Sequence, residues 1–150
     1  MASRRRVRIF EYQPKYLADL TSLMSQWEGE RTFSEEQVCD NLEQVLERSD
    51  SRVYIAEIAG RGVGYAQTTV NYYLGQPPHV EIVQLLVDQE HRGIGVGTAL
   101  LGWIEREYAV EGWKSFRLHS RIERSRAHVL YERQDYRLFK VSKFFQKRLP

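Results

Sequence analysis

The sequence lacks the features that mark membrane-spanning, secreted and disulfide-bonded proteins. Its apolar runs are only a few residues long, against the roughly 20 that a membrane-spanning helix requires. The basic start, residues 1–6, is not followed by the apolar segment of a secretory signal. Among 150 residues there is one cysteine, Cys39, which excludes an internal disulfide and is typical of a reducing compartment. We therefore expect a cytoplasmic protein that does not interact with a membrane.

The overall composition is not extreme, but the charge is unevenly distributed. Hydrophobic residues make up 42% and charged residues 28% of the chain, as in ordinary globular proteins. With no linker, repeat or low-complexity segment, the length predicts one domain over residues 1–150. Residues 28–50 carry eight acidic residues against two arginines, whereas residues 114–150 carry eleven lysines and arginines against three acidic residues. Such asymmetry can steer ligands of opposite charge to different parts of a molecule, although solvated element faces also explain it.

Hydrophobic periodicity predicts strands that alternate with helices. Strands are expected over residues 6–12, 52–58, 63–73, 80–87 and 113–120, with a last strand or pair of strands over 136–149. Helices are expected over residues 14–27, from Ser34, over 97–112 and from Ser125. Gln37, three residues after Ser34, predicts a reciprocal capping box, and Gly75, Pro77 and Pro78 are expected to break the chain. The nearly continuous apolar run in 80–87 indicates a central strand covered on both faces. This order predicts an α/β fold with a mixed sheet and helices on both faces.

A glycine-rich loop, His-Arg-Gly-Ile-Gly-Val-Gly-Thr over residues 91–98, lies between the 80–87 strand and the next helix. Glycines allow backbone N–H groups to approach an anion, and the N-terminus of a helix adds a partial positive charge. The loop therefore predicts a phosphate-bearing ligand, although a plain tight turn also fits. Its glycine spacing differs from the dinucleotide fingerprint, and no Gly-Lys-Ser/Thr of a nucleotide-triphosphate loop follows.

Two motifs together resemble the GNAT superfamily of N-acetyltransferases. Arg92-Gly93-Ile94-Gly95-Val96-Gly97 resembles its acetyl-CoA signature, and residues 127–136, Ala-His-Val-Leu-Tyr-Glu-Arg-Gln-Asp-Tyr, resemble its Ala-x-x-Leu-Tyr-Glu-x-x-Gly-Phe helix and turn. Arg124 stands where the family often has asparagine, and Asp135 replaces the usual glycine. Aspartate tolerates the left-handed backbone better than most residues, so we expect the turn to form. The resemblance implies a GNAT-like α+β fold with a mostly antiparallel central sheet flanked by helices on both faces.

The resemblance also implies a reaction and a binding site. The protein would transfer acetyl from acetyl-CoA to a primary amine by direct, ternary-complex transfer, without a metal. The strand end would contact pantetheine and the thioester, with the amide near Leu86 facing the developing oxyanion. The loop would hold the pyrophosphate. The residues implied are Leu85, Leu86, Val87, Arg92, Gly93, Ile94, Gly95, Val96, Gly97 and Thr98.

Two catalytic residues follow from the resemblance. Glu81, on the same strand, matches the position of the glutamate general base of some members, and Tyr131 matches the general-acid tyrosine. A phenol has a pKa near that of the departing thiol, which favours proton donation. Glu81 could instead be a surface carboxylate beside a water chain, and Tyr131 a packed helix aromatic. His119 is an alternative base, and the four histidines show no metal-binding spacing.

The acidic stretch predicts a small cationic amine as acceptor, because a cleft lined with carboxylates concentrates cations. The alternative is that Glu36, Asp40, Glu43 and Glu47, spaced 4-3-4, form the solvated stripe of a helix. Other functions left open are a non-catalytic acyl-CoA-binding or regulatory module and a protein N-acetyltransferase. Binding to nucleic acid is not favoured, because stacking or groove-binding elements are missing. Because family members are often dimers, a homodimer is also open.

Overall fold

The computed structural model describes residues 6–27 and 32–150, and it contains a five-stranded sheet in the order β1-β2-β3-β4-β5. The first four strands pair antiparallel, and β5 pairs parallel with β4. This confirms the predicted mixed, mostly antiparallel sheet. The bounds are β1 Arg8–Glu11, β2 Ser51–Ile58, β3 Arg61–Tyr73, β4 Gln76–Val87 and β5 Phe116–Leu118.

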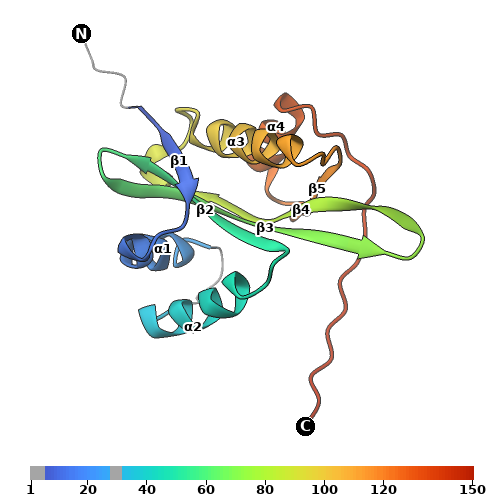
Figure 1. Ribbon diagram of the computed structural model, residues 1–150, viewed down its shortest axis with the longest axis horizontal. Coiled ribbons are helices and arrows are strands. Elements are labelled where there is room, and N and C mark those ends of the chain that lie inside the picture. The colour runs from blue at the N-terminus through green and yellow to red at the C-terminus, as the bar shows by residue number, and fades with distance from the viewer. Residues whose placement is uncertain (1–5, 28–31) are drawn as a thin grey trace. The chain divides into compact units, whose positions relative to one another are not determined.

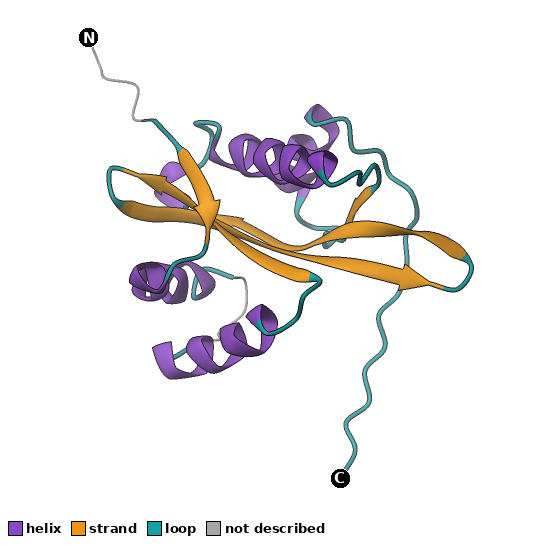
Figure 2. Cartoon of the chain, viewed as in Figure 1, coloured by secondary structure: helices purple, strands orange, loops and turns teal. Residues whose placement is uncertain are grey.

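Helices cover both faces of this sheet, as the sequence predicts (Figures 1 and 2). On one face lie α1 (Leu17–Met24), which follows the short helix η1 (Pro14–Tyr16), and α2 (Glu35–Leu46). On the other lies α3 (Val96–Val110), which follows η2 (Gln89–His91). In the described part of the chain, no helix is long and apolar enough to cross a membrane.

The chain divides into two compact units, Met1–His119 and Ser120–Pro150. The first contains the sheet with α1, α2 and α3, and the second contains α4 (Ser125–Arg133). The second unit closes its helix with a tight turn in which Asp135 adopts a φ of 64°. The left-handed turn expected at this position is therefore formed without glycine.

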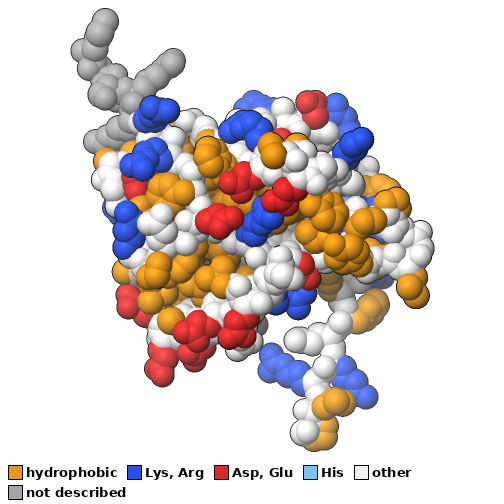
Figure 3. Space-filling view, viewed as in Figure 1, with side chains coloured by type: hydrophobic (Ala, Val, Ile, Leu, Met, Phe, Trp, Pro, Cys, Tyr) orange, Lys and Arg blue, Asp and Glu red, His pale blue; other side chains and the backbone are white. Residues whose placement is uncertain are grey.

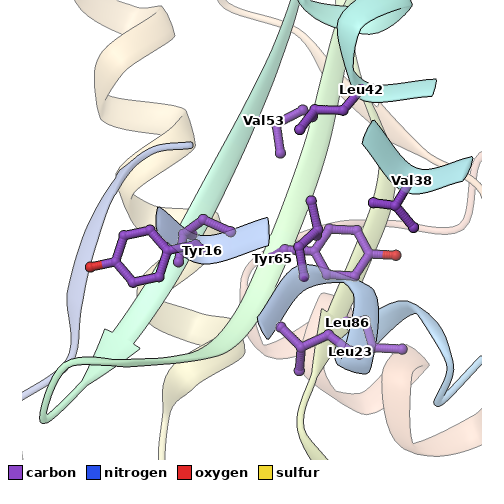
Figure 4. Packing of buried hydrophobic residues seen from close by; sticks show 9 residues of the cluster. Tyr16, Leu23, Val38, Leu42, Val53, Tyr65 and Leu86 are labelled. Carbon is purple, nitrogen blue, oxygen red and sulfur yellow. The ribbon is translucent and has the colours of Figure 1, made fainter. Parts of the chain in front are cut away.

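The α1–α2 face of the sheet is held by one hydrophobic cluster (Figure 4). Apolar residues spaced three or four apart on the two helices pack against alternate residues of the strands, because both spacings place side chains on one face. The predicted capping box forms at the start of α2, where Ser34 Oγ accepts from the Gln37 amide at 3.2 Å and Gln37 accepts from the Ser34 amide at 3.0 Å. The buried members of the cluster are Tyr16, Leu20, Leu23, Val38, Leu42, Val53, Ile55, Tyr65 and Leu86.

On the opposite face, α3 approaches β3 closely at Gly64. A Cβ atom there would lie 3.2 Å from the Leu86 carbonyl oxygen, 3.2 Å from Val96 Cγ1 and 3.3 Å from Leu100 Cδ1. Further along the helix, the hydroxyls of Tyr108 and Thr68 form a buried hydrogen bond of 2.7 Å. These contacts fix the N-terminus of α3 against the end of β4.

Three of the predicted strands differ from the structure. The strand predicted over 136–149 is not formed, because a strand requires a neighbouring strand for its hydrogen bonds and this segment pairs with none of the described strands. The strand predicted over 113–120 is limited to Phe116–Leu118. β4 begins at Gln76 and includes two prolines that were expected to break the chain. The 136–149 segment leaves large apolar side chains exposed, among them Leu138, Phe139, Val141, Phe144 and Phe145.

The close approach at Gly64 generates a stability prediction. We expect Gly64→Val to lower the free energy of unfolding by about 1–3 kcal/mol, because the added atoms must push α3 or the Leu86 carbonyl away from β3. Gly75→Val is the matched control, since a Cβ atom at Gly75 would meet no atom within 4 Å. Urea unfolding of the two variants and the parent measures the difference. Equal stability of the two variants would contradict the proposed contact.

Candidate active site

The predicted cofactor strand separates from its neighbour halfway along its length. β4 pairs with β5 only over Val80–Phe116, Glu81–Arg117 and Ile82–Leu118, so Val83 to Val87 have no partner strand on that side. At this point β4 carries a bulge: Gln67 of β3 faces Gln84 while Thr68 faces Ile82, which leaves Val83 as the extra residue. The result is an open strand edge inside the sheet.

The direction of the backbone groups along this edge follows from the β3–β4 ladder. The Asp88 amide donates to the Val63 carbonyl at 2.8 Å, and in an antiparallel pair successive residues alternate between facing the partner and facing away. The backbone of Leu86 therefore faces β3, whereas the backbone groups of Leu85 and Val87 face the open edge. From the sequence we expect an amide near Leu86 at the oxyanion, and the phase of the ladder leaves the amides of its two neighbours, Leu85 and Val87, facing the open edge.

The glycine loop leads from this edge into α3. Gly93 and Gly95 have φ values of 76° and 94°, a region that favours glycine, and Gly95 is the N-cap of the 15-residue α3. A Cβ atom on either glycine would meet no protein atom within 4 Å, so the space beside the loop is open. The first turn of α3 has no side-chain cap and no acidic residue. The amides of Val96, Gly97 and Thr98 are those that an α-helix leaves without an internal acceptor.

Hydrogen bonds also hold the residues at the start of the loop. The Arg92 Nε donates to the Val87 carbonyl at 3.0 Å, which ties this cation to the end of β4, while Ile94 is exposed. The buried Asp88 accepts from Gln26 at 2.7 Å and from the His91 ring at 2.6 Å. Burial acts to raise the pKa of Asp88, but these hydrogen bonds outweigh it and the pKa lies below its usual value. The carboxylate is thus a charged anchor between α1 and the loop.

Glu81 lies between two polar partners. Its Oε2 accepts from Asn71 Nδ2 at 2.5 Å, and its Oε1 lies 2.8 Å from His119 Nδ1. The structure thus brings together the two base candidates of the sequence analysis. Asn71 was missed, because only the β3–β4 register, which places Asn71 and Glu81 diagonally across the two strands, reveals it.

Tyr131 is buried on α4, in the second compact unit, whereas Glu81 and the glycine loop belong to the first. Burial raises the pKa of its phenol, and the charge of Arg124 opposes the shift. Its ring packs edge-to-face on Tyr136, with the centroids 6.2 Å apart. A phenol in this environment stays protonated at neutral pH, as a proton donor must.

Four of the acidic residues of 28–50 lie on the solvent side of α2 and its C-cap. Glu36, Asp40, Glu43 and Glu47 are all exposed, opposite the buried Val38 and Leu42. Figure 3 shows the acidic side chains gathered over this helix. The 4-3-4 spacing is therefore a solvated stripe, as the alternative interpretation held. Glu28 and Glu30 lie outside the described residues.

A second chain of polar groups, not predicted, extends from Trp27, three residues after the end of α1, to Gln84 beside the β4 bulge. Trp27 Nε1 donates to the Tyr65 hydroxyl at 2.5 Å, and this hydroxyl donates to Gln84 Oε1 at 2.9 Å.

Over residues 6–27 and 32–150, no group of three or more His, Cys, Asp and Glu side chains could hold a metal ion.

Comparisons with known proteins indicate the same family as the sequence motifs. An uncharacterized N-acetyltransferase of Methanocaldococcus jannaschii is 36% identical over 85 residues, which are 56% of this chain and 51% of the relative. The match thus spans about half the length of that relative. Two solved structures share the fold: the aminoglycoside N-acetyltransferase AAC(6')-Iy in complex with CoA, and a transcriptional regulator from Bacillus halodurans C-125.

Both structural similarities extend over nearly the whole chain. The aminoglycoside enzyme has a TM-score of 0.81 and 19% identity, and the alignment covers 96% of each chain. The regulator has a TM-score of 0.84 and 17% identity, with 95% of this chain and 100% of the other covered. The sequence model of the "Acetyltransferase (GNAT) family" matches residues 16–136, which include strands β2 to β5, the glycine loop and α4. The chain therefore belongs to the GNAT acetyltransferase family.

Proposed function

We propose that the protein transfers the acetyl group of acetyl-CoA to a primary amine, with both substrates bound at once. The observation that carries this proposal is the open edge of β4, which leads directly into the glycine loop and the N-terminus of α3. A pantetheine arm carries amides that can pair with a strand edge, and a pyrophosphate suits a helix N-terminus. The complex of AAC(6')-Iy with CoA, a protein of the same fold, supports this assignment.

Each residue of the proposed site has a separate task. The loop from Arg92 through Gly93, Ile94, Gly95, Val96 and Gly97 to Thr98 binds the pyrophosphate through its amides, and the Arg92 guanidinium adds positive charge. The edge groups of Leu85 and the amide of Val87 hold the pantetheine arm and polarise the thioester carbonyl. Glu81 belongs to the base that removes a proton from the ammonium group, and Tyr131 gives its proton to the leaving thiolate. We propose one acetyltransferase domain over residues 1–150.

We infer that the acceptor is a small cation. By the alternation of β3, Asn71 lies on the same sheet face as Tyr65, and Asn71 binds Glu81, so the base faces the α1–α2 side. The exposed acidic stripe of α2 belongs to this side and attracts cations over a Debye length. That several proteins of this fold are aminoglycoside acetyltransferases, whose substrates carry amino groups, supports the same class.

A substitution in the loop tests the binding of acetyl-CoA. Gly95→Val should raise the dissociation constant at least about tenfold, or about 1.4 kcal/mol, because its side chain enters the open space beside the loop. Gly112→Val is the matched control, because Gly112 has nearly the same φ, 95°, at the opposite end of α3. Calorimetry with acetyl-CoA measures both. Unchanged affinity in a folded Gly95→Val protein would overturn the phosphate-loop assignment.

The proton donor is tested by removing one oxygen atom. Tyr131→Phe should lower kcat about 10- to 1,000-fold with little change in acetyl-CoA affinity, because the phenol acts only when the thiolate leaves. Tyr136→Phe, which removes the same atom from the other ring of the aromatic pair, should keep the parental kcat. Release of CoA thiol gives the rate. Parental kcat in Tyr131→Phe would return this residue to a packing role.

The acceptor class is tested with a screen and a charge-neutralised variant. Polyamines and aminoglycosides should be acetylated faster than neutral amino acids and aminophosphonates. The double variant Glu36→Gln/Glu43→Gln should raise KM for the best cation several-fold at low salt, and the difference should vanish at high salt because screening removes long-range attraction. Glu123→Gln/Glu132→Gln neutralises two exposed acids elsewhere and serves as control. A preference for an anionic acceptor would refute the cation assignment.

A further inference from the structure

The Glu81 carboxylate is held at both oxygens rather than directed alone toward a substrate. Asn71 donates to one oxygen and the His119 ring lies at hydrogen-bond distance from the other, 2.5 and 2.8 Å away. The Glu81 side chain is 20% exposed, whereas that of His119 is 54% exposed. The group with more access to a substrate is therefore the imidazole, and the carboxylate lies behind it.

The strand register builds this arrangement. Glu81 faces Thr69 on β3 and Arg117 on β5. Asn71 lies two residues after Thr69 on β3, toward the β3–β4 hairpin. His119 follows two residues after Arg117, so both side chains point to the face of the sheet that carries Glu81. His119 is also the first residue after the last β4–β5 pair, Ile82–Leu118. The imidazole thus lies where the two strands begin to separate.

The hydrogen bond sets which ring nitrogen carries the proton. An ionised carboxylate only accepts hydrogen bonds, so Nδ1 must donate to Glu81. In the neutral ring the lone pair then lies on Nε2, which is the atom that can take a proton from a substrate. The carboxylate stabilises the imidazolium that forms, in the way that an acidic partner orients a catalytic histidine in other enzymes.

We propose that His119 is the group that takes the proton from the acceptor ammonium, and that Glu81, itself held by Asn71, is a positioning residue acting through it. This inference rests on the proposed acetyl transfer and specifies how its base function works. His119 Nε2 takes one proton from R–NH3⁺, the amine lone pair forms the C–N bond, and the C–S bond breaks. The thiolate takes a proton from Tyr131, the attached nitrogen loses its second proton and reprotonates the phenolate, and His119 releases one proton to solvent.

The position of the Glu81–His119 pair allows an acceptor amine to lie between the His119 base and the thioester. Leu85, whose backbone faces the open edge, is three residues beyond Ile82, about 10 Å along β4. This is enough space for an ammonium group. The titratable and charged groups near His119 are Glu81 and His79 on β4 and Arg117 on β5, of which Arg117 donates to Gln76 at 2.7 Å. Burial, and then the Arg117 charge, lower the pKa of His79, which is therefore neutral at pH 7.

The test compares pH profiles of kcat/KM for the parent, His119→Gln and Glu81→Gln. His119→Gln should lose about 100-fold at pH 7 and approach the parent near pH 10, where the amine is itself deprotonated. Glu81→Gln should lose less than His119→Gln at pH 7, because the imidazole that takes the proton is still present. His128→Gln, on α4, should follow the parent.

The outcomes separate this inference from the proposed function. A parent that binds acetyl-CoA but transfers no acetyl group to any amine would refute the function itself. An active parent whose kcat/KM at pH 7 is kept in His119→Gln but lost in Glu81→Gln would show that the carboxylate takes the proton directly and would overturn the role of His119. Unchanged acetyl-CoA affinity by calorimetry in both variants ensures that the kinetic differences do not come from a lost fold.

Discussion

The structure depends on one constraint, the loss of strand pairing between β4 and β5 after the pair Ile82–Leu118. Elsewhere in the described sheet, β4 pairs with β3 along nearly its whole length, so the open side is a local interruption and not a general weakness. Unpaired backbone groups inside a protein cost free energy unless another partner takes their place. A strand edge that is left without a paired strand therefore favours an extended ligand with amides of its own, and the pantetheine arm of acetyl-CoA has that chemistry.

The surrounding contacts keep the opening in place. The bulge at Val83 changes the direction of β4, and the missing side chain of Gly64 lets α3 pack close to the end of the strand. Asp88, charged although buried, links the loop to α1 through Gln26. Because a rigid site loses less entropy on binding than a mobile one, these contacts contribute to affinity without touching the ligand. The fold thus provides the anion site and the strand edge as one rigid unit.

The sequence was sufficient for the elements and for the glycine loop, because periodicity and glycine spacing are local properties. It predicted the sheet flanked by helices, the capping box at Ser34 and the left-handed turn at Asp135. It could not predict which backbone amides face the open edge, because the phase of the β3–β4 ladder depends on a bulge. It also missed Asn71 beside Glu81, since a contact between strands requires the register. The strand predicted over 136–149 is not formed, for a related reason. Alternating apolar residues give a strand one apolar face, but the hydrogen bonds of its backbone require a neighbouring strand.

The same opening connects binding to proton transfer. The paired part of β4 and β5 carries Glu81, and the unpaired part carries Leu85 and Val87, so a single strand holds the carboxylate and the edge groups at a fixed separation. Side chains and backbone amides of a strand point in perpendicular directions, out of the sheet and along it. In the reaction that we propose, the amine approaches Glu81 and His119 from the α1–α2 face while the thioester lies in the plane of the sheet. This perpendicular approach is what addition to a planar carbonyl carbon requires, because the nucleophile must attack from above the carbonyl plane. Had β5 continued to pair with β4, the edge groups would be satisfied by a strand and the carbonyl would have no place beside the base.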